Sequence, residues 1–177
     1  MISQKLHAAV NAQINAELWS AYLYLAMSLD AESKGYKGFA NWFYIQFQEE
    51  QAHARIFMNY LNSRDAKVEL LPIEEVPSTW DSVLEMYKHT LNHEKKVTSL
   101  INNLAAIARD DNDFASINRL TWFIDEQVEE EESARDMIDG NAIKDTNSKI
   151  KNFFIFLIGF HLYYLANLIN FDDLTII

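Results

Sequence analysis

The fold is decided by residues 49–53, which read EEQAH, and by residues 126–130, which read EQVEE. The two stretches begin 77 positions apart (126 − 49). In the first, Glu50 and His53 are three apart and share one face of a helix, and the second holds Gln127 and Glu130 at the same spacing. Either stretch alone has a plain interpretation, because Glu-x-x-His occurs by chance and a glutamate run is usually a solvated face. Their repetition favours a metal site.

A third pair extends the repeat, because Glu17 and Glu94 are also 77 positions apart (94 − 17). Apolar residues surround both glutamates, so we expect both to be buried. A buried, unpaired carboxylate is costly and calls for a cation. The alternative, that both lie on solvated faces, is the weaker one given the matched positions. Two helix pairs related by a pseudo-two-fold axis would gather these residues in one bundle core: Glu17, Glu50, His53, Glu94, Gln127 and Glu130.

Apolar residues recur at helical spacing over residues 4–33, 39–63, 79–109 and 113–139. Ser3 is the expected cap of the first helix, Ser78 or Thr79 that of the third, and Gly140 the expected end of the fourth. Residues 64–78 contain both prolines and no sustained period. A connection of this length can run along a 30-residue helix of about 45 Å, so the second and third helices can be parallel. The sequence predicts an all-α four-helix bundle with a long crossover.

Composition narrows the function. There is no Cys, which excludes disulfides, iron–sulfur clusters and thiolate metal sites, and leaves oxygen and imidazole ligands. The net charge is −11 and no Lys/Arg cluster is present, so we expect no nucleic-acid partner. No apolar signal-peptide core is seen near the first residues, so we expect a cytoplasmic protein.

Over about residues 3–139 the chain resembles the prokaryotic non-haem ferritins. That resemblance implies a first iron site of Glu17, Glu50 and His53, with Glu50 bridging to a second site. The second site adds Glu94 and either Gln127 or Glu130. It further implies a third iron site nearby, made of Glu49, Glu126, Glu129 and Glu130.

The resemblance also places Tyr24 and Trp122 beside the metal centre. Tyr24 can bond to a metal ligand or supply an electron, although a core aromatic with a satisfied hydroxyl is an equal alternative. Trp122 has core packing as its plain interpretation. No haem is expected, because the residue after Glu50 is Gln51 where the haem-binding relatives carry Met.

The implied function is iron storage. A ferroxidase centre would oxidise Fe(II) with O2 or H2O2, and a homo-oligomer, usually of 24 subunits in this family, would hold the hydrated ferric oxide. A di-iron oxygenase acting on an organic substrate is the alternative enzyme, and a shell subunit with a degenerate centre is the structural alternative. The route by which iron reaches the centre stays open, because Ile117 and Leu120 stand where animal ferritins carry acidic channel residues.

The C-terminal part departs from the family pattern. We expect residues 1–145 to form the di-iron bundle and residues 146–177 to be an atypical apolar segment. Its stretch 153–169 is expected to be a short fifth helix buried between subunits. A membrane anchor is a weaker alternative, because about 20 apolar residues are normally needed to span a bilayer. An altered terminus with no family role is the third.

Overall fold

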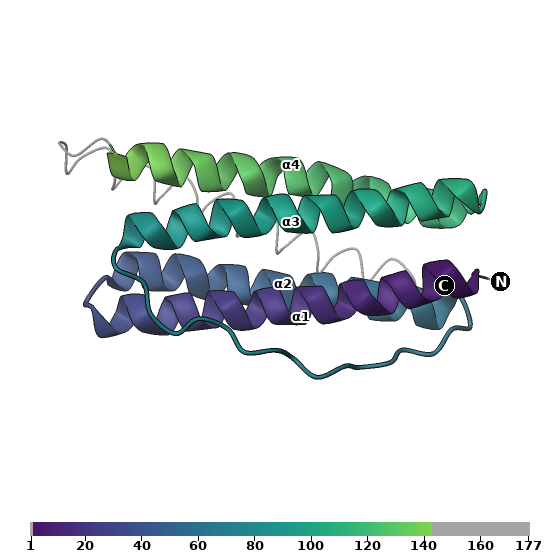
Figure 1. Ribbon diagram of the computed structural model, residues 1–177, viewed down its shortest axis with the longest axis horizontal. Coiled ribbons are helices and arrows are strands. Elements are labelled where there is room, and N and C mark those ends of the chain that lie inside the picture. Colours follow the sequence, from purple (N-terminus) through teal and green to yellow (C-terminus); the bar gives the residue numbers. More distant parts are fainter. Residues whose placement is uncertain (1, 143–177) are drawn as a thin grey trace, which may run out of the picture.

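The computed structural model describes residues 2–142, and these form an all-α bundle. Its helices are α1 (Gln4–Ser33), α2 (Lys37–Ser63), α3 (Val83–Asp110) and α4 (Phe114–Ala142). Figure 1 shows α1 lying with α2 and α3 with α4, while the α2–α3 connection runs along the outside of the bundle. This long crossover makes α2 and α3 parallel, as the sequence predicts.

The helix ends follow local chemistry. Ser3 caps α1 by accepting a hydrogen bond from the backbone N–H of Leu6 at 3.1 Å, which confirms the expected cap. After α1, Gly35 takes a φ of 80°, a left-handed conformation that glycine adopts without a steric penalty. Gly140 was expected to end the fourth helix, but α4 continues through it to Ala142.

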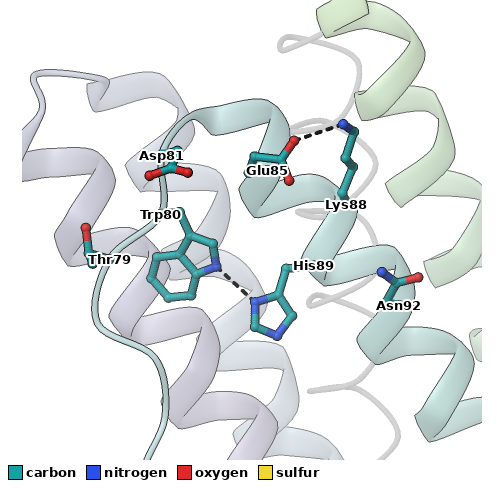
Figure 2. Close-up of a pocket in the computed structure, with 7 residues that line it drawn as sticks. All are labelled: Thr79, Trp80, Asp81, Glu85, Lys88, His89 and Asn92. Carbon is teal, nitrogen blue, oxygen red and sulfur yellow. Dashed lines mark hydrogen bonds and ion pairs between the residues drawn. The ribbon is translucent and has the colours of Figure 1, made fainter.

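The start of α3 differs from the prediction. The helix begins at Val83, and its cap is Ser82, which accepts from the backbone N–H of Glu85 at 3.2 Å, so Ser78 and Thr79 were the wrong caps. Contacts of Trp80 account for the later start. Its backbone N–H donates to Asp30 Oδ2 at 3.1 Å, and its indole Nε1 donates to His89 Nδ1 at 2.9 Å across a shallow pocket (Figure 2). These bonds keep the end of the crossover against α1 and α3, outside the helix.

The core has a polar layer between two apolar clusters. One cluster contains Leu23, Met27, Phe43 and Tyr87. The other contains Ile14, Phe57, Ile101 and Phe123. On each helix the buried glutamates predicted as ligands come between the positions that supply the two clusters. The layer therefore crosses the bundle near its middle. Its acidic and histidine members that the sequence pointed to are Glu17, Glu49, Glu50, His53, Glu94, Glu126 and Glu130.

Within residues 2–142 no helix combines the length and the apolar character needed to cross a membrane. The predicted fifth helix and the apolar stretch 153–169 lie outside the described residues.

Candidate metal centre

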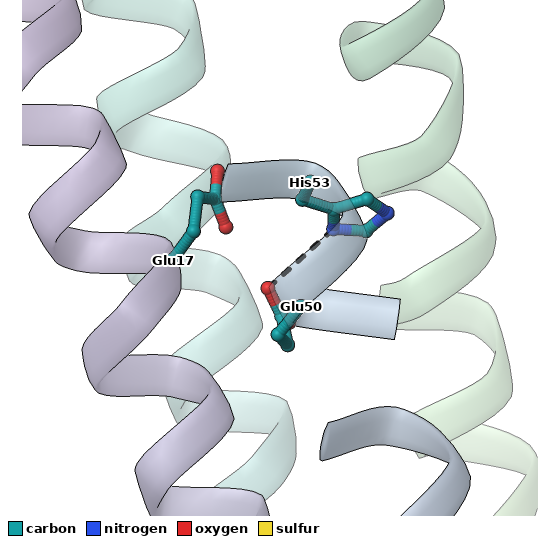
Figure 3. Close-up of side chains that lie close together, drawn as sticks. All are labelled: Glu17, Glu50 and His53. Atoms are coloured by element: carbon teal, nitrogen blue, oxygen red, sulfur yellow. Dashed lines mark ion pairs between the residues drawn. The ribbon is translucent and has the colours of Figure 1, made fainter. Parts of the chain in front are cut away.

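The α1 and α2 helices bring three of the predicted ligands together. Glu17, Glu50 and His53 each offer a ligand atom, and these atoms all lie within 4.8 Å of one another. All three residues are at least 98% buried. His53 Nδ1 lies 3.4 Å from Glu50 Oε2, the pairing that a three-residue spacing on one helix face allows (Figure 3). Two carboxylates and one imidazole, arranged this closely, suit a divalent metal ion.

A second group uses the same histidine. Glu49, His53 and Glu126 also offer ligand atoms that lie within 4.8 Å of one another. Glu49 and Glu126 are 2% and 4% exposed, so this group is as secluded from water as the first. Glu49 and Glu126 are the repeat-related pair, so the repeat does place equivalent positions of α2 and α4 face to face.

Glu94 is held by neutral donors rather than by a cation. The Tyr24 hydroxyl donates to Glu94 Oε1, and Gln127 Nε2 donates to Glu94 Oε2 at 3.2 Å. Gln127 lies also within 3.4 Å of Thr98 Oγ1. Glu94 therefore sits on the α3 side of the polar layer with Tyr24 from α1 and Gln127 from α4 directed at its carboxylate.

The remaining predicted residues surround these groups. Gln46 Nε2 donates to both carboxylate oxygens of Glu130, at 3.3 and 3.2 Å. The Trp122 ring meets the His53 ring edge-on, with centroids 5.6 Å apart. Glu129 is half-buried and belongs to neither of the two groups that share His53.

The buried carboxylates of the polar layer raise one another's pKa values. Burial, followed by the charges of Glu17 and Glu94, raises the pKa of Glu50 well above its ordinary value. Burial and the charges of Glu49, Glu94 and Glu126 do the same to the pKa of Glu130. Burial also raises the pKa of Glu94, although the hydrogen bonds from Tyr24 and Gln127 oppose it. These carboxyls resist ionising together, and a bound cation would remove that resistance.

The surroundings of His53 also suit a metal ion. His53 Nε2 is buried and finds no hydrogen-bond partner among residues 2–142. Buried polar atoms nearly always have a hydrogen-bond partner. A buried ring nitrogen without one, beside carboxylates, is therefore a candidate metal ligand. Hard carboxylate oxygens with imidazole suit iron, zinc or manganese.

Sequence reasoning missed the neutral residues that support the layer. Gln13 donates to Glu17 Oε1 at 2.8 Å, and Gln46 holds Glu130. Their signal was spacing: Gln13 is one turn before Glu17, and Gln46 is one turn before Glu50, on the same helix faces. His93 was also missed. It is 8% exposed, lies 2.8 Å from Ser20 Oγ through Nε2, and burial lowers its pKa to about 4, so it is neutral at pH 7.

Comparisons with known proteins point to one family. A family model described as a ferritin-like domain matches residues 7–141. The chain is 42% identical over 139 residues to a bacterial non-heme ferritin from Bacteroides fragilis (strain 638R), covering 78% of this chain and 87% of that relative. A protein of the same name from Staphylococcus aureus (strain USA300) is 42% identical over 131 residues, covering 74% and 79%. An open pore ferritin from the hyperthermophilic archaeon Archaeoglobus fulgidus has a TM-score of 0.81 at 43% identity, covering 84% of this chain and 92% of that one.

Proposed function

Because the chain belongs to the ferritin-like family, among the prokaryotic non-haem ferritins, we propose that its polar layer binds Fe(II), oxidises it, and serves an iron store. The oxidant would be O2 or H2O2. The ferric product would be kept as a hydrated oxide inside a homo-oligomeric shell, with 24 subunits as the family's usual number. The observation that carries this proposal is the crowding of buried carboxylates around His53, with no Lys or Arg among the buried residues of 2–142.

We assign roles to the side chains from the family resemblance, with support from their positions. Glu17, Glu50 and His53 would hold one iron ion, with Glu50 reaching a second ion beside it. Glu94 would hold the second, together with Gln127 or Glu130. The bonds that Glu94 accepts from Tyr24 and Gln127 would orient its carboxylate toward the ion.

Glu49, Glu126, Glu129 and Glu130 would provide a third iron site. Of these, Glu49 and Glu126 are within ligand reach of one another, and Glu130 is close enough that both raise its pKa. A third ion beside the first two would receive or supply iron during turnover.

The ligand set favours oxidation of the substrate ion. Carboxylate oxygens are hard ligands and stabilise Fe(III) over Fe(II), which lowers the potential at which iron gives up an electron. Two Fe(II) ions, held close together, can supply the two electrons that reduce O2 to H2O2 or H2O2 to water. Tyr24, bonded to Glu94 and packed near His93 with ring centroids 6.2 Å apart, is placed to support electron transfer at this site.

Aerobic addition of Fe(II) to the purified protein tests the proposal. We expect ferric absorbance to grow faster than in buffer, with the iron retained on a large particle. Glu50→Ala and His53→Ala should each slow oxidation by at least about 100-fold, since even outer partners of metal ligands are commonly worth 10 to 100-fold. Glu132→Ala, an exposed glutamate on α4, is the matched control and should oxidise iron normally. Unchanged rates in Glu50→Ala and His53→Ala, with helicity retained, would rule out this site.

A further inference from the structure

A network of hydrogen-bonded side chains crosses the interface of α3 and α4, from the surface to the polar layer. At its outer end, the exposed Arg135 donates from Nη1 to Glu131 Oε2 at 3.2 Å. Thr98 Oγ1 lies 2.8 Å from the other oxygen of that carboxylate, Oε1, and donates to it. At the inner end, Gln127 Nε2 lies 3.4 Å from Thr98 Oγ1 and donates to Glu94 Oε2 at 3.2 Å. Thr98 and Glu131 are not among the predicted ligands, yet the network connects them to one.

The single hydroxyl proton of Thr98 decides the direction of the bond to Gln127. A hydroxyl has one proton and two lone pairs. Two oxygen atoms lie within reach of that proton: Glu131 Oε1, and the backbone carbonyl of Glu94 one turn earlier, at 2.9 Å. A carbonyl can only accept, and so can a carboxylate that pairs with Arg135. Whichever of them takes the proton, the hydroxyl has a lone pair left for the amide, so Thr98 is an acceptor for Gln127.

Acceptors surround Nε2 of Gln127 on the α3 side. They are Glu94 Oε2, the Glu94 backbone carbonyl at 3.3 Å and Thr98 Oγ1. An amide turned by 180° would place its own oxygen against these acceptors, which is repulsive. The amide nitrogen is therefore held toward α3, while Oε1 accepts no hydrogen bond among residues 2–142. The oxygen is the atom through which an amide binds a metal ion.

We propose that Thr98 is a positioning residue of the candidate metal centre, and that its hydroxyl keeps the Gln127 amide turned so that Oε1 faces an ion held by Glu94. Glu131 contributes by accepting the hydroxyl proton. This inference rests on the proposed function, because it assumes that Glu94 holds a metal ion. It deepens that function by adding a residue outside the ligand set on which the geometry of one ligand depends.

The hydroxyl matters most once an ion is bound. An amide nitrogen has two protons and needs two acceptors where it is buried, and Gln127 is only 4% exposed. An ion on Glu94 engages the carboxylate oxygens, which leaves Thr98 Oγ1 and the Glu94 backbone carbonyl as the acceptors for Nε2. Without the hydroxyl one N–H has no partner, and the amide turns to find another. Its carbonyl oxygen then moves away from the ion.

A double-mutant cycle with zinc separates positioning from a merely structural role, because zinc binds oxygen ligands and has no redox chemistry. Thr98→Val removes the hydroxyl and keeps the shape of the side chain. In Gln127→Glu the two carboxylate oxygens are equivalent, so this ligand needs no orientation. We expect Thr98→Val to weaken zinc binding beside Glu94 at least about tenfold when residue 127 is Gln, and less than about twofold in the Gln127→Glu background. Calorimetry measures the affinities, and anomalous diffraction identifies the ion beside Glu94.

Two further variants and the wild type complete the test. Thr98→Ser keeps a hydroxyl and should keep the affinity, and Ser99→Ala, which removes an exposed hydroxyl from the same helix, is the matched control. In zinc-soaked wild-type crystals we expect Gln127 Oε1 at about 2.0–2.2 Å from the zinc beside Glu94. An equal loss in both backgrounds overturns the proposal, as does an unchanged affinity in Thr98→Val. Zinc absent from Glu94, or out of ligand range of Oε1, overturns it as well. None of these results touches the proposed function, which wild-type Fe(II) oxidation decides separately.

Discussion

Carboxylates in two regions of this bundle have opposite electrostatic surroundings. At the end of the bundle, Arg64, the residue that follows α2, forms two hydrogen bonds with Asp113, from Nη1 to Oδ1 at 3.0 Å and from Nη2 to Oδ2 at 2.9 Å. Burial acts to raise the pKa of Asp113, but the bonds from Arg64 and Ser116 outweigh it and lower the pKa. In the middle of the bundle, Glu50 and Glu130 have raised pKa values. None of the buried residues of 2–142 is a Lys or an Arg that could pair with them.

The difference shows where the chain supplies its own counter-ion and where it leaves that role to a ligand. In the Arg64–Asp113 pair both charges come from the chain itself, and the pair joins the end of α2 to the start of α4. The polar layer is deeper and more acidic, and in it Gln13, Gln46 and Gln127 donate hydrogen bonds to Glu17, Glu130 and Glu94. Because no Lys or Arg is among the buried residues of 2–142, binding of a cation should be linked to stability there and not at the Arg64 pair.

The largest expected effect is metal-linked stabilisation of the wild type. A divalent ion that binds only the folded state at 100 times its Kd adds about 2.7 kcal/mol per site to the free energy of unfolding. We expect Zn²⁺ to raise Tm in the wild type and to raise it less in Glu50→Ala, which keeps Glu49, His53 and Glu126. Thermal unfolding with and without Zn²⁺ measures both, and Asp113→Asn is the control whose Zn²⁺ response should stay intact. An equal response in Glu50→Ala would break the comparison.

Breaking the Arg64–Asp113 pair should lower the free energy of unfolding by somewhat less, and a metal ion should not restore that loss. Arg64→Ala removes two charge-assisted hydrogen bonds and the packing of the guanidinium over Tyr60, 5.5 Å from the ring centroid. We expect the free energy of unfolding to fall by about 2 kcal/mol, since hydrogen bonds to charged groups contribute about 1.5–3 kcal/mol each when buried and this pair is half-buried.

Urea unfolding of Arg64→Ala measures this loss, and Arg55→Ala, an exposed arginine on α2, is the matched control. The deficit should be the same with and without Zn²⁺. A deficit that Zn²⁺ abolishes would mean that the two regions are not independent.

The last expected effect is on the slope of stability against pH in metal-free buffer. Glu50, Glu94 and Glu130 have pKa values above those of the unfolded chain, so the folded state binds more protons. Their stability contribution is complete below the unfolded value of about 4.3 and declines as pH rises toward the raised values, by up to about 1.4 kcal/mol per pH unit for each group. Asp113 has the opposite sign, because its lowered pKa stabilises the fold above about pH 3.9.

Urea unfolding between pH 5 and 8 tests this sign. We expect the stability of the wild type to decline less steeply after Glu50→Gln, which cannot ionise, and to be unaltered in slope after Glu132→Gln. A slope that Glu50→Gln leaves unchanged would show that the buried carboxylates ionise freely.

The sequence predicted the helices and the crossover because apolar periodicity and the 77-residue repeat are properties of the chain itself. It placed Glu17 and Glu94 in the interior for the same reason, and both are at least 99% buried. It failed at the start of α3, where Ser78, Thr79 and Ser82 are all acceptable caps. Only the contact of Trp80 with Asp30, 50 positions away, decides among them. Tertiary contacts of this kind leave no local pattern.

The acidic residues of the candidate site could be predicted from the sequence, but the contacts between its side chains could not. Glu50 and His53 follow from helical spacing, but nothing in the sequence shows that His53 also lies against Glu49 and Glu126, or that Gln46 faces Glu130. Those relations depend on how α4 is rotated against α2, which packing determines. The neutral amides had the right spacing, but Gln is common on helix faces and carries no chemistry of its own.

Anaerobic equilibrium binding of Fe(II) tests the central claim most directly, namely that the carboxylate layer takes its counter-ion from solution. We predict that each wild-type subunit binds at least two Fe(II) ions, and that the double variant Glu17→Ala/Glu50→Ala binds fewer while remaining helical, because it keeps only the acids of the third site. Equal Fe(II) binding by the wild type and the double variant would contradict the account.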